Sequence, residues 1–145
     1  MNREILFRAK RVDNGEWVIG SLLQGITHDK ECTIIVPRSE LFSMIGTSFC
    51  EECNRHYDID YEVHPETVGE FTGLKDRKGK RIFNGDILER LQNGFIYGVH
   101  FYNGGYHIID ADGYVIKPTQ KAVSYMQVEV IGNIHDNPEL LEVEE

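Results

Sequence analysis

Two cysteines and a histidine stand at a spacing that could hold a metal ion. They are Cys50, Cys53 and His56, in the segment CEECNRH. Thiolate and imidazole ligands build tetrahedral zinc sites, and Cys32 or His64 could supply the fourth ligand. The second pair of closely spaced cysteines that usually completes such a site is absent from the sequence. Free thiols on a loop are therefore the favoured interpretation, and no cofactor is expected.

A short basic segment over residues 75–81 offers a second kind of chemistry. It concentrates positive charge in a chain whose formal net charge is −9. Such a cluster could dock an acidic partner or a phosphate. Charge runs are usually solvated faces, however, so a hairpin tip in water is the favoured interpretation. Its basic residues are Lys75, Arg77, Lys78, Lys80 and Arg81.

Carboxylates and histidines offer a third possibility, a hydrolase. Asp86 could act with His100 or His107 if the fold brought these groups together in one cleft. Spacing alone predicts no such arrangement, and we expect the Asp86 carboxylate to bind the amides of a turn. Asp110 and Asp112 lack the other ligands of a calcium loop, so they too are predicted to be structural.

The elements that must position these residues are short strands joined by tight turns. Fourteen glycines and repeated Asn-Gly or Asp-Gly steps separate short apolar stretches, which is typical of hairpins. We predict a hairpin meander over residues 66–134 and one short helix near residues 138–142. The fold class is therefore mainly β: a small bent sheet or an SH3-like, partly open barrel built from hairpins, with one or two short helices.

Residues 67–90 are predicted to serve the backbone. Glycines fall where a turn or bulge requires freedom from a Cβ, and aspartates stand where turn amides are free to donate. This structural motif comprises Gly69, Gly73, Asp76, Gly79, Gly85 and Asp86. Apolar members of the alternating runs should form the core. They are Phe7, Trp17, Ile82, Phe83, Ile87, Val99, Phe101, Val130 and Ile134.

Length and composition are those of an ordinary globular domain. The chain has 145 residues, of which 41% are hydrophobic and 27% charged. The negative net charge argues against nucleic-acid binding. The charged start, MNREILFRAK, does not fit a signal peptide, and no apolar run is long enough to span a bilayer. We therefore expect a cytoplasmic location, reduced thiols and no membrane contact.

Three blocks of sequence resemble the YopX family of phage and prophage proteins. The segment TVGEFTGLKDRKGKRIFNGDILER resembles the family signature T-V-G-x-[YF]-T-G-L-x-D-x-x-G-x-x-I-[YF]-x-G-D-I. The opening REILFRAKRVDNGEWVIGSL and the closing VEVIGNIHDNPELL resemble the family's terminal blocks, whereas residues 28–63 match no fixed pattern. The matching signature residues are Thr67, Val68, Gly69, Phe71, Thr72, Gly73, Leu74, Asp76, Gly79, Ile82, Phe83, Gly85, Asp86 and Ile87.

This resemblance implies a phage or prophage origin and a β-rich fold, but no established activity. We expect one YopX-like unit over residues 1–145. A soft division would separate an N-terminal β part with the irregular cysteine segment, 1–65, from the meander and short helix, 66–145. The leading functional hypothesis is a non-enzymatic interaction or accessory protein of the bacterial cytosol, which binds a host or phage protein and self-associates. A small nucleic-acid-binding barrel is the alternative, and a hydrolase ranks third.

Overall fold

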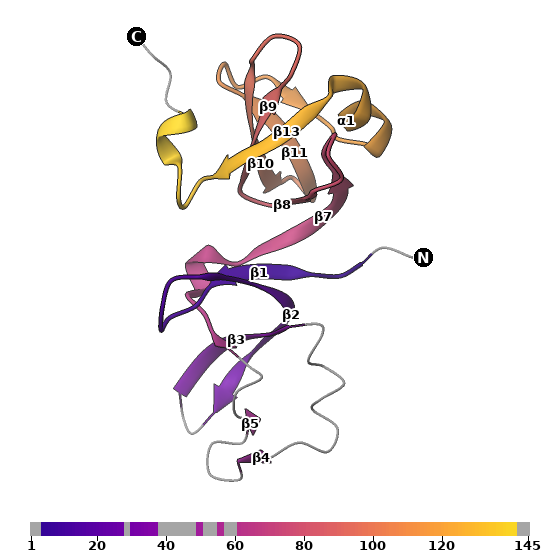
Figure 1. Cartoon of the computed structure of the whole chain (residues 1–145). Coiled ribbons are helices and arrows are strands. Elements are labelled where there is room, and N and C mark those ends of the chain that lie inside the picture. The colour runs from indigo at the N-terminus through magenta and orange to yellow at the C-terminus, as the bar shows by residue number, and fades with distance from the viewer. Residues whose placement is uncertain (1–3, 28–29, 38–48, 51–54, 57–60, 142–145) are drawn as a thin grey trace. The chain divides into compact units, whose positions relative to one another are not determined.

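Antiparallel strands dominate the computed structural model, which describes residues 4–27, 30–37, 49–50, 55–56 and 61–141 (Figure 1). The predicted β-rich fold class is thus confirmed, with open bent sheets across the described strands. The chain forms two compact units. The N-terminal unit comprises Ile5–Glu70, and the C-terminal unit comprises Phe71–Glu145 together with Met1–Glu4. No helix among the described residues has the length and apolar character needed to cross a bilayer.

The N-terminal unit is an antiparallel sheet in the strand order β6-β3-β2-β1-β7. Its hairpin between β1 and β2 turns at Gly15, which has a φ of 73° and fits the predicted Asn-Gly turn. A separate pair of short strands, β4 and β5, lies in the same unit. The elements are β1 (Phe7–Lys10), β2 (Trp17–Thr27), β3 (Lys30–Pro37), β4 (Phe49–Cys50), β5 (Arg55–His56), β6 (Tyr61–Glu62), the 3-10 helix η3 (Pro65–Thr67) and the start of β7 (Gly69–Lys75).

One face of this sheet carries the N-terminal core. Ala9, Val18, Ile35 and Val63 are buried there. Gly20 on β2 is required by close packing, because a Cβ at this position would overlap the backbone carbonyl of Val36. Close backbone approach is one of the two reasons for a glycine inside a strand.

Cationic side chains lie over the Trp17 ring of the N-terminal unit. The guanidinium of Arg8 lies 4.9 Å from the centre of the Trp17 ring, and the ammonium of Lys10 lies 5.5 Å from it. Trp17, predicted to be buried, is therefore half-buried beneath charged groups rather than enclosed by apolar ones.

An exposed ion pair on the same unit shifts the pKa values of both its members. Arg11 donates two hydrogen bonds to the Asp13 carboxylate. These bonds, more than the Coulomb attraction that accompanies them, lower the pKa of Asp13 and raise the pKa of Arg11. The pair lies at the surface and so contributes little to stability.

The C-terminal unit is a five-stranded antiparallel sheet in the order β12-β11-β10-β9-β13. It contains the predicted meander, and its last strand returns to pair with β9. A short helix lies beside this sheet (Figure 1). The elements are β8 (Arg81–Phe83), β9 (Asp86–Arg90), β10 (Ile96–Tyr102), β11 (Gly105–Asp110), β12 (Val115–Ile116), α1 (Gln120–Met126), β13 (Val128–Asn133) and the 3-10 helix η4 (Pro138–Leu141).

The helix α1 was not predicted from the sequence, and it completes the C-terminal core. It contributes Val123 and Met126 to a cluster that includes Leu88 and Tyr97. Its local signal is Thr119, whose hydroxyl accepts a 3.1 Å hydrogen bond from a backbone amide as an N-cap does. The short helix predicted near residues 138–142 is present as the 3-10 helix η4.

Predicted core residues fall into three groups. Ile82, Phe83, Ile87 and Val99 are buried, as predicted. Phe7, Trp17, Val130 and Ile134 are half-buried. The prediction for Phe101 is wrong, because its side chain is 57% exposed. Phe101 has the correct parity on β10 but lies near the hairpin tip, where its ring packs on Tyr106 instead of the core. Alternation predicts the face of a strand, not how far the covering layer extends.

Candidate functional site

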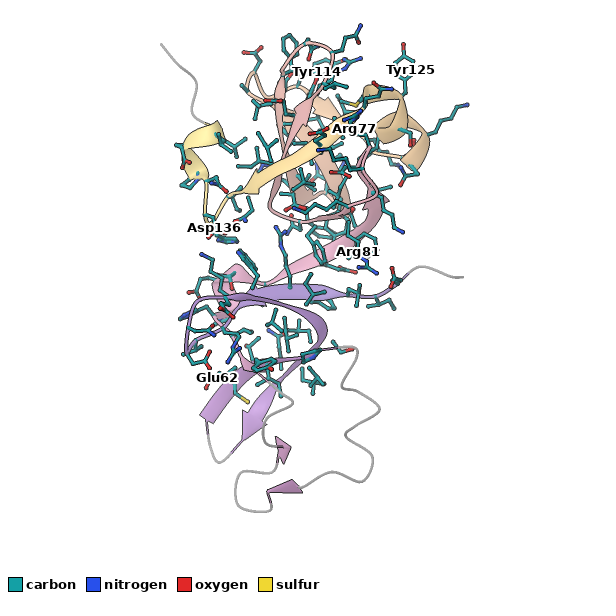
Figure 2. The ribbon with its side chains drawn as sticks, viewed as in Figure 1. Glu62, Arg77, Arg81, Tyr114, Tyr125 and Asp136 are labelled. Carbon is teal, nitrogen blue, oxygen red and sulfur yellow. The ribbon has the colours of Figure 1, made fainter. Side chains whose placement is uncertain are left out.

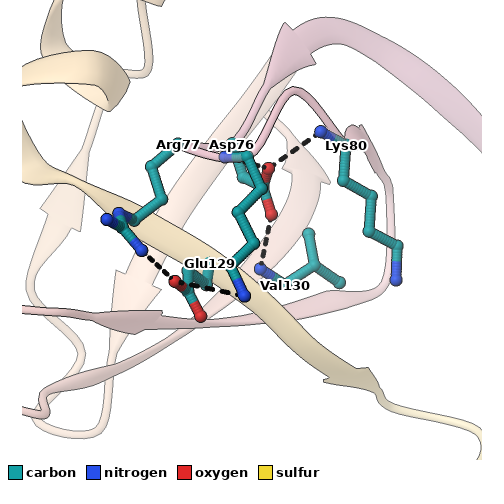
Figure 3. A network of polar contacts seen from close by, with 6 residues as sticks. Asp76, Arg77, Lys80, Glu129 and Val130 are labelled. Atoms are coloured by element: carbon teal, nitrogen blue, oxygen red, sulfur yellow. Dashed lines mark hydrogen bonds and ion pairs between the residues drawn. The ribbon is translucent and has the colours of Figure 1, made fainter.

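A buried carboxylate, Asp76, organises the turn between β7 and β8. The residue is only 7% exposed. One carboxylate oxygen accepts hydrogen bonds from the backbone amides of Lys78 at 2.9 Å and Lys80 at 2.8 Å. The other oxygen accepts from the amide of Val130 on β13 at 3.0 Å (Figure 3). We call these three bonds to Asp76 the Asp76 clamp, and they join the turn to a strand 54 residues away in the chain.

The same turn covers the edge of β13. The amide of Arg77 donates to the carbonyl of Val128 at 3.0 Å. The guanidinium of Arg77 pairs with Glu129, and the ammonium of Lys78 lies 3.7 Å from the same carboxylate (Figure 3). The turn therefore occupies backbone groups that would otherwise be open to another strand.

The basic segment does not form a single cationic patch. Arg77 and Lys78 share Glu129. Arg81, predicted to point outward, donates to both oxygens of the Glu4 carboxylate at 2.9 and 3.0 Å and lies over the Phe71 ring. Among the described residues, Lys75 and Lys80 form no ion pair. The expectation of five solvated cations thus holds for only part of the segment.

Three of the four motif glycines have backbone angles that other residues rarely adopt. Gly73, Gly79 and Gly85 have φ values of 88°, 81° and 93°. Gly73 lies at the register shift between β7 and β8, and Gly79 and Gly85 lie in turns. Gly69 differs, because its φ is not positive and it lies within β7 opposite Arg8.

Replacing Gly79 by valine should lower the free energy of unfolding by about 1–2 kcal/mol, since a β-branched residue resists the left-handed conformation. A Cβ at this position meets no other atom within 4 Å, so the loss reports backbone strain alone. Urea denaturation measures it. The matched control is the double variant Lys78→Ser, Lys80→Ser, which should change stability by less than about 0.5–1 kcal/mol. Equal losses in the two variants would contradict the backbone interpretation.

The carboxylate and imidazoles of the hydrolase hypothesis lie on different faces of the C-terminal sheet. Asp86 is buried and accepts a 2.7 Å hydrogen bond from the amide of Phe83. Its side chain has the parity of Leu88, which pairs with Tyr97 on the core face. His100 pairs with His107 and has the opposite parity. These groups therefore do not converge on a common substrate.

Two other predicted sites remain, the Asp110 turn and the possible zinc site. Asp110 accepts hydrogen bonds from the amides of Asp112 and Tyr114 in an exposed turn. For the zinc hypothesis, Cys53 and the side chains of Cys50 and His56 lie outside the described residues. Two candidate fourth ligands are described. Cys32 is half-buried on β3, and the ring of His64 lies 3.7 Å from the Glu66 carboxylate.

Two threonines of the signature also bind the backbone, a role that sequence reasoning missed. The Thr72 hydroxyl donates to the Ile82 carbonyl at 2.7 Å and accepts from the Leu74 amide at 3.2 Å. The Thr67 hydroxyl accepts from the Lys10 amide at 2.9 Å and donates to a carbonyl of its own turn. The sequence could have indicated this role, because both threonines belong to the turn-rich signature and hydroxyls commonly bind backbone groups in turns.

Comparison with known proteins identifies a matching family and a solved structure of similar fold. A family model described as YopX protein matches residues 6–142. No curated protein shows significant similarity to the chain. A crystal structure of protein EF1440 from Enterococcus faecalis is similar in fold, with a TM-score of 0.55 and 22% sequence identity. That similarity covers 97% of this chain and 100% of the other.

Proposed function

This chain belongs to the YopX protein family, and from that premise we propose that it is a non-enzymatic binding protein. It is encoded by a phage or prophage and acts in the cytosol of the bacterial host. Its partners are a host or phage protein and further copies of itself. Family membership supports the origin, and the use made of the signature residues supports the binding role.

The observation that carries the proposal is the engagement of the signature's polar side chains. Each of them binds backbone groups of the same chain, which leaves little polar chemistry for a substrate. The residues are Thr67, Thr72, Asp76 and Asp86. The closing block behaves alike, since the Asn133 side chain accepts from the amides of His135 and Asp136. These shared motifs build the scaffold, so activity belongs to exposed surfaces.

Exposed aromatic side chains on the C-terminal unit are available for such contacts. Tyr125 on α1 is 82% exposed, and Tyr114 before β12 is 70% exposed (Figure 2). Phe95 and Phe101 are also exposed. Tyrosine and phenylalanine are enriched in protein interfaces, where they bury large areas at low entropic cost.

Sedimentation and affinity capture test this proposal together. The purified protein should sediment as more than a monomer at micromolar concentration, and it should retain a specific protein from infected or lysogenic cells. The double variant Tyr114→Ser, Tyr125→Ser should lose one or both properties while keeping its urea midpoint. The control variant Lys78→Ser, Lys80→Ser should keep both. A monomeric protein that retains nothing beyond a tag-only control would overturn the proposal.

A second candidate function, binding of single-stranded nucleic acid, is favoured by one feature. Trp17 lies beneath Arg8 and Lys10, and aromatic rings beside cations can stack bases and attract phosphates. The net charge of −9 opposes it. Because Trp17 is the single tryptophan of the chain, tryptophan fluorescence reports binding at this residue directly. Quenching by a short oligonucleotide that weakens steeply with salt would favour this function over the first.

A further inference from the structure

A cleft of about 300 Å³ lies at the tip of the β10–β11 hairpin in the C-terminal unit. Its walls come from three segments of this unit: β7, the hairpin tip and the residues that precede α1. The lining residues are Thr72, Leu74, Asn103, Gly104, Gly105, Tyr106, His107, Lys117 and Pro118. This volume is at the lower end of small-molecule sites, so it suits a ligand with one ring.

The hairpin geometry keeps the cleft open and fixes an aromatic wall. Asn103 and Gly104 both have positive φ values, 49° and 81°, as a two-residue type I′ turn requires. Two consecutive glycines place backbone rather than side chains at this wall. The Tyr106 ring packs edge-on against Phe101, with centroids 5.1 Å apart, which restrains its orientation. Leu74 and Pro118 add apolar surface.

The charge of the cleft is the reverse of the charge of the protein. Lys117 lines it, and no acidic residue is among the described residues that line it. Two more lysines stand on neighbouring segments. Lys75 follows Leu74, and its backbone exchanges hydrogen bonds of 3.0 and 3.2 Å with the side chain of Gln120, the residue before Lys121.

None of these lysines is neutralised by an ion pair among the described residues, unlike Arg77, Lys78 and Arg81. A local excess of positive charge on a protein with a net charge of −9 attracts small anions. An ammonium group binds phosphate or carboxylate through charge-assisted hydrogen bonds.

We propose that this hairpin-tip cleft binds a small aromatic anion, a flat ring that carries a phosphate or carboxylate group. The ring stacks on Tyr106 between Leu74 and Pro118, and the anionic group pairs with Lys117. Lys75 and Lys121 strengthen the attraction at longer range. The site is separate from the exposed tyrosines of the proposed function, so either can fail without the other.

The proposal is tested by titrating the full chain with four probes while the NMR chemical shifts of its backbone amides are monitored. The probes are phenyl phosphate, benzoate, inorganic phosphate and phenol. Phenyl phosphate or benzoate should give saturable shifts at Gly104, Gly105 and Tyr106, with a Kd at least tenfold below that of inorganic phosphate or phenol. Lys117→Gln should weaken the aromatic anion at least fivefold. Lys80→Gln, the matched control, removes an exposed lysine outside the cleft and should change nothing.

Three results would overturn the proposal. The first is the absence of saturable shifts with either aromatic anion. The second is equal weakening by Lys117→Gln and Lys80→Gln, which would indicate non-specific attraction. The third is equal affinity for inorganic phosphate and phenyl phosphate, which would remove the role of the Tyr106 ring. Because Lys117 is exposed, its variant should fold normally, and an unchanged amide spectrum without probe verifies this.

Discussion

Replacing Asp76 by alanine should lower the free energy of unfolding by about 3–5 kcal/mol, because three backbone amides would lose the buried carboxylate that accepts their hydrogen bonds. The Asp76 carboxylate is the acceptor in all three bonds of the clamp, from the amides of Lys78, Lys80 and Val130. Urea denaturation at neutral pH measures the loss. A second readout is amide exchange, which should accelerate at Val130 more than elsewhere on β13.

Asp110 provides a control with the same chemistry at the surface. Its carboxylate also accepts from two backbone amides, but in an exposed turn where water can replace it. Asp110→Ala should therefore cost only about 1 kcal/mol. Similar losses in the two variants would show that burial does not determine how much the Asp76 clamp contributes to the free energy of unfolding.

Replacing Ile87 by alanine should lower the free energy of unfolding by about 3–4 kcal/mol. Ile87 lies on the interior strand β9, between β10 and β13, and is fully buried, so the truncation leaves a cavity that the surrounding sheet cannot close. The midpoint of urea denaturation should shift with little change in its slope.

The control for this variant is Ile131→Ala on β13, in the same sheet. Ile131 is 37% exposed, so the same chemical deletion removes fewer contacts and should cost less than about 1 kcal/mol. A small loss at Ile87, comparable with that at Ile131, would contradict the complete burial of the Ile87 side chain.

Local sequence determined the hairpins of this protein and the chemistry of their turns. Gly79 and Gly85 follow residues that favour turns, and both have the positive φ that such turns demand. The alternation of the segment that forms β10 placed Val99 in the core. These features are predictable because they depend on neighbours within a few residues. The family signature was visible for the same reason, since its residues form one continuous segment.

Only the tertiary structure decided what those residues contact. Asp76 was readable as a turn aspartate, but its bond to Val130 joins segments 54 positions apart. The pairing of Arg81 with Glu4 is likewise non-local, and it turned an expected solvated cation into part of a packed surface.

The candidate sites were separated by the same long-range geometry. Strand register put Asp86 and His100 on opposite faces. Packing between segments that are not paired as strands brought Leu74, Tyr106 and Lys117 around one cleft. Periodicity gives the face of each strand but not the strands that cover it, and those depend on how the whole chain packs.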